Sequence, residues 1–143
     1  MTTSSASALW QGGLKAGTGT FQARSGAFAG PYTFATRFEG AKGTNPEELI
    51  AAAHAACLSM ALAAGLEKSG SPAKEIATTA SATVEFIGGA PRISSMKLVV
   101  RGKVPGIDQA KFTQAAEEAK NGCPVSNALK GNVKIELDAL LLE

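Results

Sequence analysis

The sequence predicts an α+β fold that contains an antiparallel sheet. Short strand-like segments with glycine-rich turns fill residues 6–38, and one long apolar helix follows at residues 45–70. Further strands and helices then occupy residues 76–142. Strands grouped around a helix, without a regular βαβ series, are typical of this class. A chain of 143 residues is long enough for one core, so residues 1–143 are predicted to form a single domain.

The N-terminal segments are predicted to form an antiparallel meander. Alternating and β-branched residues indicate strands at 8–11, 18–24 and 32–38. The stretches GGLKAG and SGAFAG separate these strands and supply the turns. EGAKGTNP then forms a loop that leads into the long helix.

The long helix has a well-marked start and end. Asn45 is the expected N-cap, Pro46 takes the first helical position, and Glu47 and Glu48 favour the positive end of the helix dipole. Gly70 is expected to close the helix. Apolar residues cover nearly every face, which indicates burial on all sides. Because a single sheet covers only one side, we expect a second subunit to cover the other.

The C-terminal half is predicted to contain a hairpin, two helices and a closing strand. Residues 76–87 and 93–104 alternate as paired strands, and residues 108–120 form an amphipathic helix that ends at Asn121-Gly122. A short helix is expected after Cys123, with Pro124 at its first position. Residues 132–142 form the last strand.

Composition excludes several functional classes. A net charge of +2 without a basic cluster argues against nucleic-acid binding. One His and two Cys are too few for a zinc site, and no phosphate-binding motif is present, so no metal or cofactor is expected. The sequence shows neither a leader peptide nor an uninterrupted membrane span, so we expect a cytoplasmic protein without membrane contact. In the cytoplasm its two thiols would be kept reduced, which favours transient redox chemistry over a permanent disulfide.

The two cysteines have different predicted surroundings. Cys123 lies at a helix N-terminus, where backbone N–H groups favour a thiolate. Cys57 lies mid-helix among apolar residues, where burial raises the pKa of a thiol, so it needs a cation from elsewhere to react. Either cysteine could instead be a packed residue. His54 lies one turn before Cys57, but a lone histidine on an apolar helix is more often a packed core residue, so no role is assigned to it.

Three segments together carry a resemblance to a known family. TRFEGAKGTNPEELIAAAHAACLSMAL, VPGID and NGCPVSNALKGNV closely resemble the osmotically inducible protein C (OsmC) branch of the OsmC/Ohr hydroperoxide reductase family. The resemblance implies an OsmC-like fold in which antiparallel sheets wrap around a central buried helix in an intertwined homodimer. It also implies a peroxidatic Cys57, a resolving Cys123, an Arg37 at the peroxidatic sulfur and a Glu47 that holds this arginine.

The implied activity is thiol-dependent reduction of organic hydroperoxides to alcohols. Cys57 would become a sulfenic acid and then form a disulfide with Cys123. A dithiol, which the family implies to be a dihydrolipoyl group, would regenerate the thiols. Two alternatives are a thiol-based redox sensor or binding protein without turnover, and a structural dimer with packed cysteines.

Overall fold

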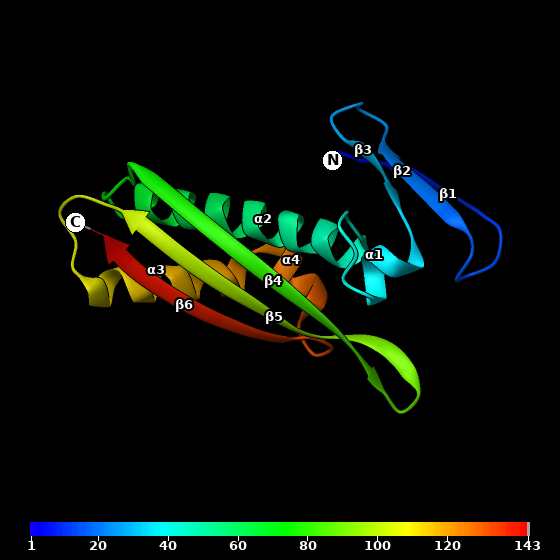
Figure 1. Ribbon diagram of the computed structural model, residues 1–143. Coiled ribbons are helices and arrows are strands. Elements are labelled where there is room, and N and C mark those ends of the chain that lie inside the picture. Colours follow the sequence, from blue (N-terminus) through cyan, green and yellow to red (C-terminus); the bar gives the residue numbers. More distant parts are fainter. Residues whose placement is uncertain (143) are drawn as a thin grey trace. The chain divides into compact units, whose positions relative to one another are not determined.

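The computed structural model describes residues 1–142, which form two compact units, one up to Leu49 and one from Ile50 onward. Figure 1 shows the elements of both units. The first unit contains β1 (Ala6–Gln11), β2 (Thr18–Ala23), β3 (Ala29–Tyr32) and α1 (Phe34–Phe38). The three strands pair antiparallel in the order β1-β2-β3, so the predicted meander is confirmed. The prediction of a single domain stays a prediction.

The predicted strand at residues 32–38 is wrong, because β3 ends at Tyr32 and a helix follows. Thr33 and Thr36 form a capping box at this point. The Thr36 N–H donates to the Thr33 hydroxyl oxygen at 3.2 Å, and the Thr33 N–H donates to that of Thr36 at 2.9 Å. Two satisfied N–H groups favour a helical turn over the strand that the composition suggested.

The long helix α2 (Pro46–Lys68) begins where the sequence predicted. The Glu48 N–H donates to Oδ1 of Asn45 at 2.8 Å, which confirms Asn45 as the capping residue. At the other end, Gly70 has a φ of 88°, a left-handed conformation that suits glycine and stops the helix. The helix starts in the first unit and continues through the second.

The second unit contains a three-stranded sheet and the helices that pack on it. The sheet has the order β4-β5-β6, with β4 (Glu75–Ile87), β5 (Ala90–Lys103) and β6 (Lys134–Leu142). Helices α3 (Gln109–Gly122) and α4 (Pro124–Leu129) connect β5 to β6. The predicted antiparallel arrangement holds for β4 with β5, but β5 and β6 pair parallel. The two connecting helices carry the chain back across the sheet, and such a crossover permits parallel pairing.

One side of α2 supplies part of the core of this unit. Leu58, Leu62 and Leu66 recur every four residues and are fully or almost fully buried. They pack in one cluster with residues of β5 and α3: Met96, Leu98, Val100, Phe112, Ala116 and Ala119. Figure 1 shows α2 and α3 beside the sheet.

The other side of α2 is apolar and exposed in the described chain. Met60 is 75% exposed, and small residues surround it at Ala53, Ala56, Ala63 and Ala64. The predicted burial on all sides therefore does not occur within one chain, and the predicted second subunit stays a prediction. Among residues 1–142, α2 is the one helix whose length and composition would allow it to cross a membrane, a property that core helices of soluble proteins share.

Candidate active site

Helix α2 and the start of α4 bring the two cysteines into contact. The Sγ atoms of Cys57 and Cys123 lie 2.8 Å apart although the residues are 66 positions apart in the chain, and both thiols are free. A disulfide bond is about 2.05 Å long, so a further approach of only about 0.8 Å joins the two sulfurs. Cys57 is half-buried and Cys123 is 0% exposed. Reagents from solvent therefore meet Cys57 first.

The position of Cys123 follows from the junction of two helices. This residue is both the C-cap of α3 and the N-cap of α4, and its N–H donates to the Ala119 carbonyl at 2.8 Å. Pro124, at the first position of α4, favours the start of a new helix there. The junction therefore holds the thiol in place with the first turn of α4 beside it.

Polar groups of this turn act on the two thiols differently. Burial would raise the pKa of Cys123, but hydrogen bonds from Cys57, the Ser126 N–H and hydroxyl, and the Val125 N–H outweigh it and lower that pKa. Burial raises the pKa of Cys57, and the hydrogen bond and charge of Cys123 raise it further against one contact with Val125. The donors of this turn therefore make Cys123 the more acidic of the two thiols. The sequence-based prediction that local groups favour a thiolate at Cys123 over one at Cys57 therefore holds.

His54 contacts the cysteine pair through Ser126. The imidazole is 0% exposed, and its Nε2 lies 2.7 Å from the Ser126 hydroxyl oxygen. Burial lowers the pKa of His54, so the ring is neutral near pH 7. The prediction of a packed, hydrogen-bonded histidine is confirmed, but its partner was not foreseen. A usable signal was the spacing, since His54 lies three residues before Cys57 and Ser126 three residues after Cys123.

Arg37 and Glu47 form an ion pair within the first unit. Nη2 and Nε of Arg37 donate to Oε1 of Glu47 at 2.7 and 3.1 Å, and Nε also reaches Oε2 at 3.3 Å. Glu47 is 4% exposed, whereas the Arg37 side chain is 36% exposed. Among residues 1–142, Nη1 of Arg37 has no hydrogen bond, which leaves one edge of the guanidinium free for an anion.

Local contacts position this pair. The Asn45 side-chain amide donates to the Thr36 carbonyl at 3.0 Å and thereby connects the start of α2 to α1, which carries Arg37. The guanidinium also lies 5.1 Å from the centre of the Phe38 ring. The structure thus brings the predicted residues together as two pairs, Arg37 with Glu47 and Cys57 with Cys123. The predicted contact of Arg37 with the Cys57 sulfur stays a prediction.

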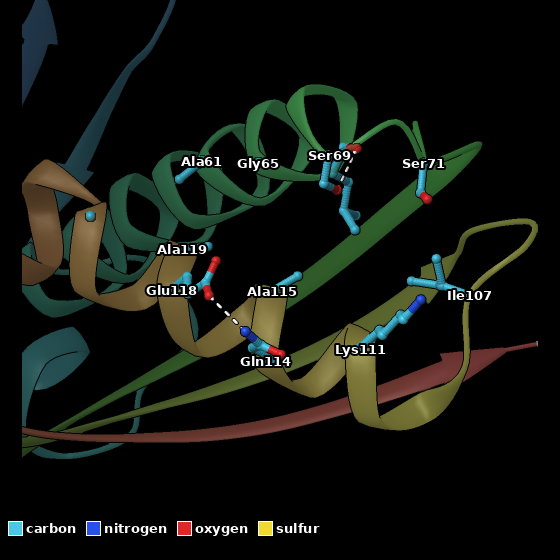
Figure 2. A pocket seen from close by; sticks show the side chains of 12 residues that line it. Ala61, Gly65, Ser69, Ser71, Ile107, Lys111, Gln114, Ala115, Glu118 and Ala119 are labelled. Atoms are coloured by element: carbon cyan, nitrogen blue, oxygen red, sulfur yellow. Dashed lines mark hydrogen bonds between the residues drawn. The ribbon is translucent and has the colours of Figure 1, made fainter.

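A groove of about 500 Å³ lies between α2 and α3 (Figure 2). Its lining includes Ala61, one helical turn after Cys57, and Gly122, which directly precedes Cys123. Figure 2 shows Lys111 and Glu118 of α3 beside the apolar lining. Among residues 1–142, no group of three or more His, Cys, Asp and Glu side chains could hold a metal ion.

Comparison with known proteins confirms the resemblance. Peroxiredoxin OsmC of Escherichia coli (strain K12) is 45% identical over 130 residues, covering 90% of this chain and 91% of that protein. The organic hydroperoxide resistance protein of Xanthomonas axonopodis pv. citri (strain 306) is 36% identical over 100 residues, 68% of each chain. The crystal structure of an organic hydroperoxide resistance protein from Elizabethkingia anophelis matches with a TM-score of 0.77 at 24% identity, over 99% of both chains. The predicted OsmC-like fold is thereby confirmed. Residues 39–138 match the sequence family described as OsmC-like protein, so the chain belongs to that family.

Proposed function

We propose that this protein is a thiol-dependent peroxidase that reduces organic hydroperoxides to alcohols, with Cys57 as the attacking thiolate and Cys123 as the resolving thiol. The observation that carries the proposal is the 2.8 Å contact between the two sulfurs, one accessible and one sealed. The names of its relatives, a peroxiredoxin and an organic hydroperoxide resistance protein, support the same class of activity.

The first step is attack of the Cys57 thiolate on one peroxide oxygen. The O–O bond breaks, the alkoxide takes up a proton to leave as an alcohol, and Cys57 becomes a sulfenic acid. The thiolate of Cys123 then attacks the oxidised sulfur, hydroxide leaves as water, and a disulfide forms. An external dithiol, for which we propose a dihydrolipoyl group, returns both cysteines to thiols by disulfide exchange.

Arg37 is proposed to supply the cation that Cys57 needs. Burial and Cys123 both raise the pKa of Cys57, so the local surroundings leave this thiol protonated near neutral pH. A guanidinium within about 4 to 6 Å would lower that pKa by about one to three units. The free Nη1 edge of Arg37 suits this contact, and Glu47 fixes the direction of the guanidinium from the opposite edge.

We propose a homodimer in which the exposed apolar side of α2 packs on a second copy of the chain. Met60 and the alanines around it form this side, and such a continuous apolar face is unusual on a monomeric protein. The groove beside Ala61 and Gly122 offers an apolar wall for the alkyl part of a hydroperoxide. A cytoplasmic location, without membrane or nucleic-acid partners, completes the proposal.

Consumption of cumene hydroperoxide in the presence of a dithiol tests this function. Cys57→Ser should abolish turnover, whereas Cys123→Ser should allow one stoichiometric event and leave a sulfenic acid on Cys57, detectable by mass spectrometry. If wild type consumes no more peroxide than Cys57→Ser, the enzyme hypothesis fails. The redox sensor then becomes the better account, because a sensor requires the disulfide but no turnover. Oxidation that appears first on Cys123 would reverse the two roles.

A further inference from the structure

The hydrogen bond between His54 and Ser126 lies directly behind the proposed resolving cysteine. Ser126 is the third residue of α4 and Cys123 is its N-cap, positions whose side chains approach each other in a helical first turn. The Ser126 hydroxyl oxygen lies 2.7 Å from Nε2 of His54, and the same hydroxyl helps to lower the pKa of the Cys123 thiol. Ser126 is itself only 3% exposed. These three side chains are therefore all shielded from solvent, and Ser126 joins the imidazole to the turn that carries the Cys123 sulfur.

The surroundings of His54 decide which ring nitrogen carries the proton. Nδ1 is buried and has no hydrogen-bond partner among residues 1–142. A proton on Nδ1 would leave a buried N–H donor without an acceptor, which proteins rarely tolerate, whereas an unpaired acceptor is tolerated more often. The proton therefore belongs on Nε2, which donates to the Ser126 oxygen. The single proton of the Ser126 hydroxyl is then free to point at the Cys123 sulfur.

We propose that Ser126 donates a hydrogen bond to the Cys123 thiolate during the resolving step, and that His54 is a positioning residue that holds the Ser126 hydroxyl in the donating orientation. The proposal rests on the function given above, because it concerns the second step of that cycle. It gives a role to the one histidine of the chain, which the first step does not use. The imidazole stays neutral throughout, consistent with the lowering of its pKa by burial.

The chemistry of the resolving step balances without any additional reagent. The Cys123 thiol first loses its proton to water, and its electron pair attacks the sulfur of the Cys57 sulfenic acid. The S–S bond forms as the S–O bond breaks, so Cys123 is oxidised and Cys57 is reduced from the sulfenic state. The leaving hydroxide takes up one proton and becomes water. Ser126 keeps its own proton, because it stabilises the thiolate by a hydrogen bond and transfers no proton.

Titration of Cys123 alone tests the proposal without peroxide. In a Cys57→Ala background, ultraviolet absorbance of the thiolate reports the pKa of the remaining thiol. Ser126→Ala should raise that pKa by about one unit, because it removes a hydrogen bond to the charged thiolate. His54→Leu should raise it by a similar amount, because the Ser126 hydroxyl is then no longer held toward the sulfur. His54→Gln keeps an N–H donor in place of Nε2–H and should restore the wild-type value. The double variant Ser126→Ala, His54→Leu should titrate as Ser126→Ala does.

Single-turnover kinetics in the chain with both cysteines gives the second readout. At a pH below the pKa of Cys123, a rise of one unit in that pKa lowers the fraction of thiolate about tenfold. Because a more basic thiolate is also a better nucleophile, part of the rate is regained, so resolution slows about three- to fourfold. The Cys57 sulfenic acid should persist longer by that factor in Ser126→Ala. An unchanged Cys123 pKa in Ser126→Ala overturns the role of Ser126, and additive shifts in the double variant overturn the route through Ser126. Failure of the proposed peroxidase would appear separately, as absence of turnover in wild type.

Discussion

The proposed role of Arg37 predicts a defined shift in the acidity of Cys57. In a Cys123→Ser background, where Cys57 is the sole thiol, removal of Arg37 should raise the pKa of Cys57. Arg37→Ala alone would leave Glu47, which is 4% exposed, as a buried carboxylate without its cation, at a cost of about 1 to 3 kcal/mol in stability. Arg37→Ala combined with Glu47→Gln removes both charges and avoids this confounding loss.

The size of the shift follows from the geometry of the ion pair. A guanidinium about 4 Å from a thiolate contributes about 4 kcal/mol at an effective dielectric constant of about 20. Glu47 occupies the Nε and Nη2 edge of Arg37, so a sulfur on the free Nη1 edge lies roughly twice as far from the carboxylate. At about 8 Å the carboxylate opposes the thiolate by about 2 kcal/mol. The net stabilisation of about 2 kcal/mol corresponds to about 1.5 pKa units.

Thiolate absorbance and the pH dependence of the first oxidation step measure this shift. The doubly neutral variant should titrate about 1.5 units above its Cys123→Ser parent, and its pH–rate curve should move to higher pH by the same amount. Arg37→Lys, which keeps the charge without the planar fork, should fall between the two. Coincident titration curves of the parent and the neutral variant would refute the placement of Arg37 at the sulfur.

Three further predictions concern residues of the second unit. Because burial lowers the pKa of His54 from 6.5, the unfolded chain takes up the proton first. As the pH falls below 6.5, urea unfolding should show that wild type loses up to about 1.4 kcal/mol of stability per pH unit more than His54→Gln, and equal slopes would contradict the lowered pKa of the ring. Met60→Glu should convert the proposed dimer to a monomer in light scattering, and an unchanged mass would place the interface elsewhere. A methyl group on Gly102 would overlap the buried Phe112 ring, so Gly102→Ala should cost about 1 to 3 kcal/mol, whereas Gly65→Ala meets no atom within 4 Å and should stabilise the helix by about 0.5 to 1 kcal/mol.

Local signals predicted the elements whose ends are set by adjacent residues. The start of α2 was predictable because Asn45 and Pro46 act within one turn, and Asp108 caps α3 in the same way, accepting from the Lys111 N–H. The segment after Tyr32 was mispredicted because its aromatic and β-branched residues favour a strand, while two threonines three residues apart satisfy a helical turn. The parallel pairing of β5 with β6 depends on the path of the whole connection, so no local pattern reports it.

The candidate site was predictable to a different extent for each pair. Glu47 was assigned to Arg37 through the family resemblance, since as a first-turn glutamate it is equally suited to the helix dipole. The approach of Cys57 to Cys123 is a tertiary contact between positions 66 residues apart, and the residues alone could only leave a dithiol open. The partner of His54 could not be predicted for the same reason, because Ser126 reaches it only after α4 packs against α2.

Cys57 is the more accessible of the two thiols and Cys123 is the more acidic one, and the proposed cycle depends on both differences. The local groups make Cys123 the more acidic thiol, but Cys123 is 0% exposed and no hydroperoxide can approach it without rearrangement. Cys57 is accessible but its pKa is raised, so it reacts first only when a cation such as Arg37 reaches it. After its oxidation, the sulfur of Cys57 no longer carries an S–H proton, and the donors around Cys123 become the main stabilisation of the second thiolate. A sealed, acidic thiol is therefore suited to attack a neighbouring sulfenic acid and unsuited to meet the substrate.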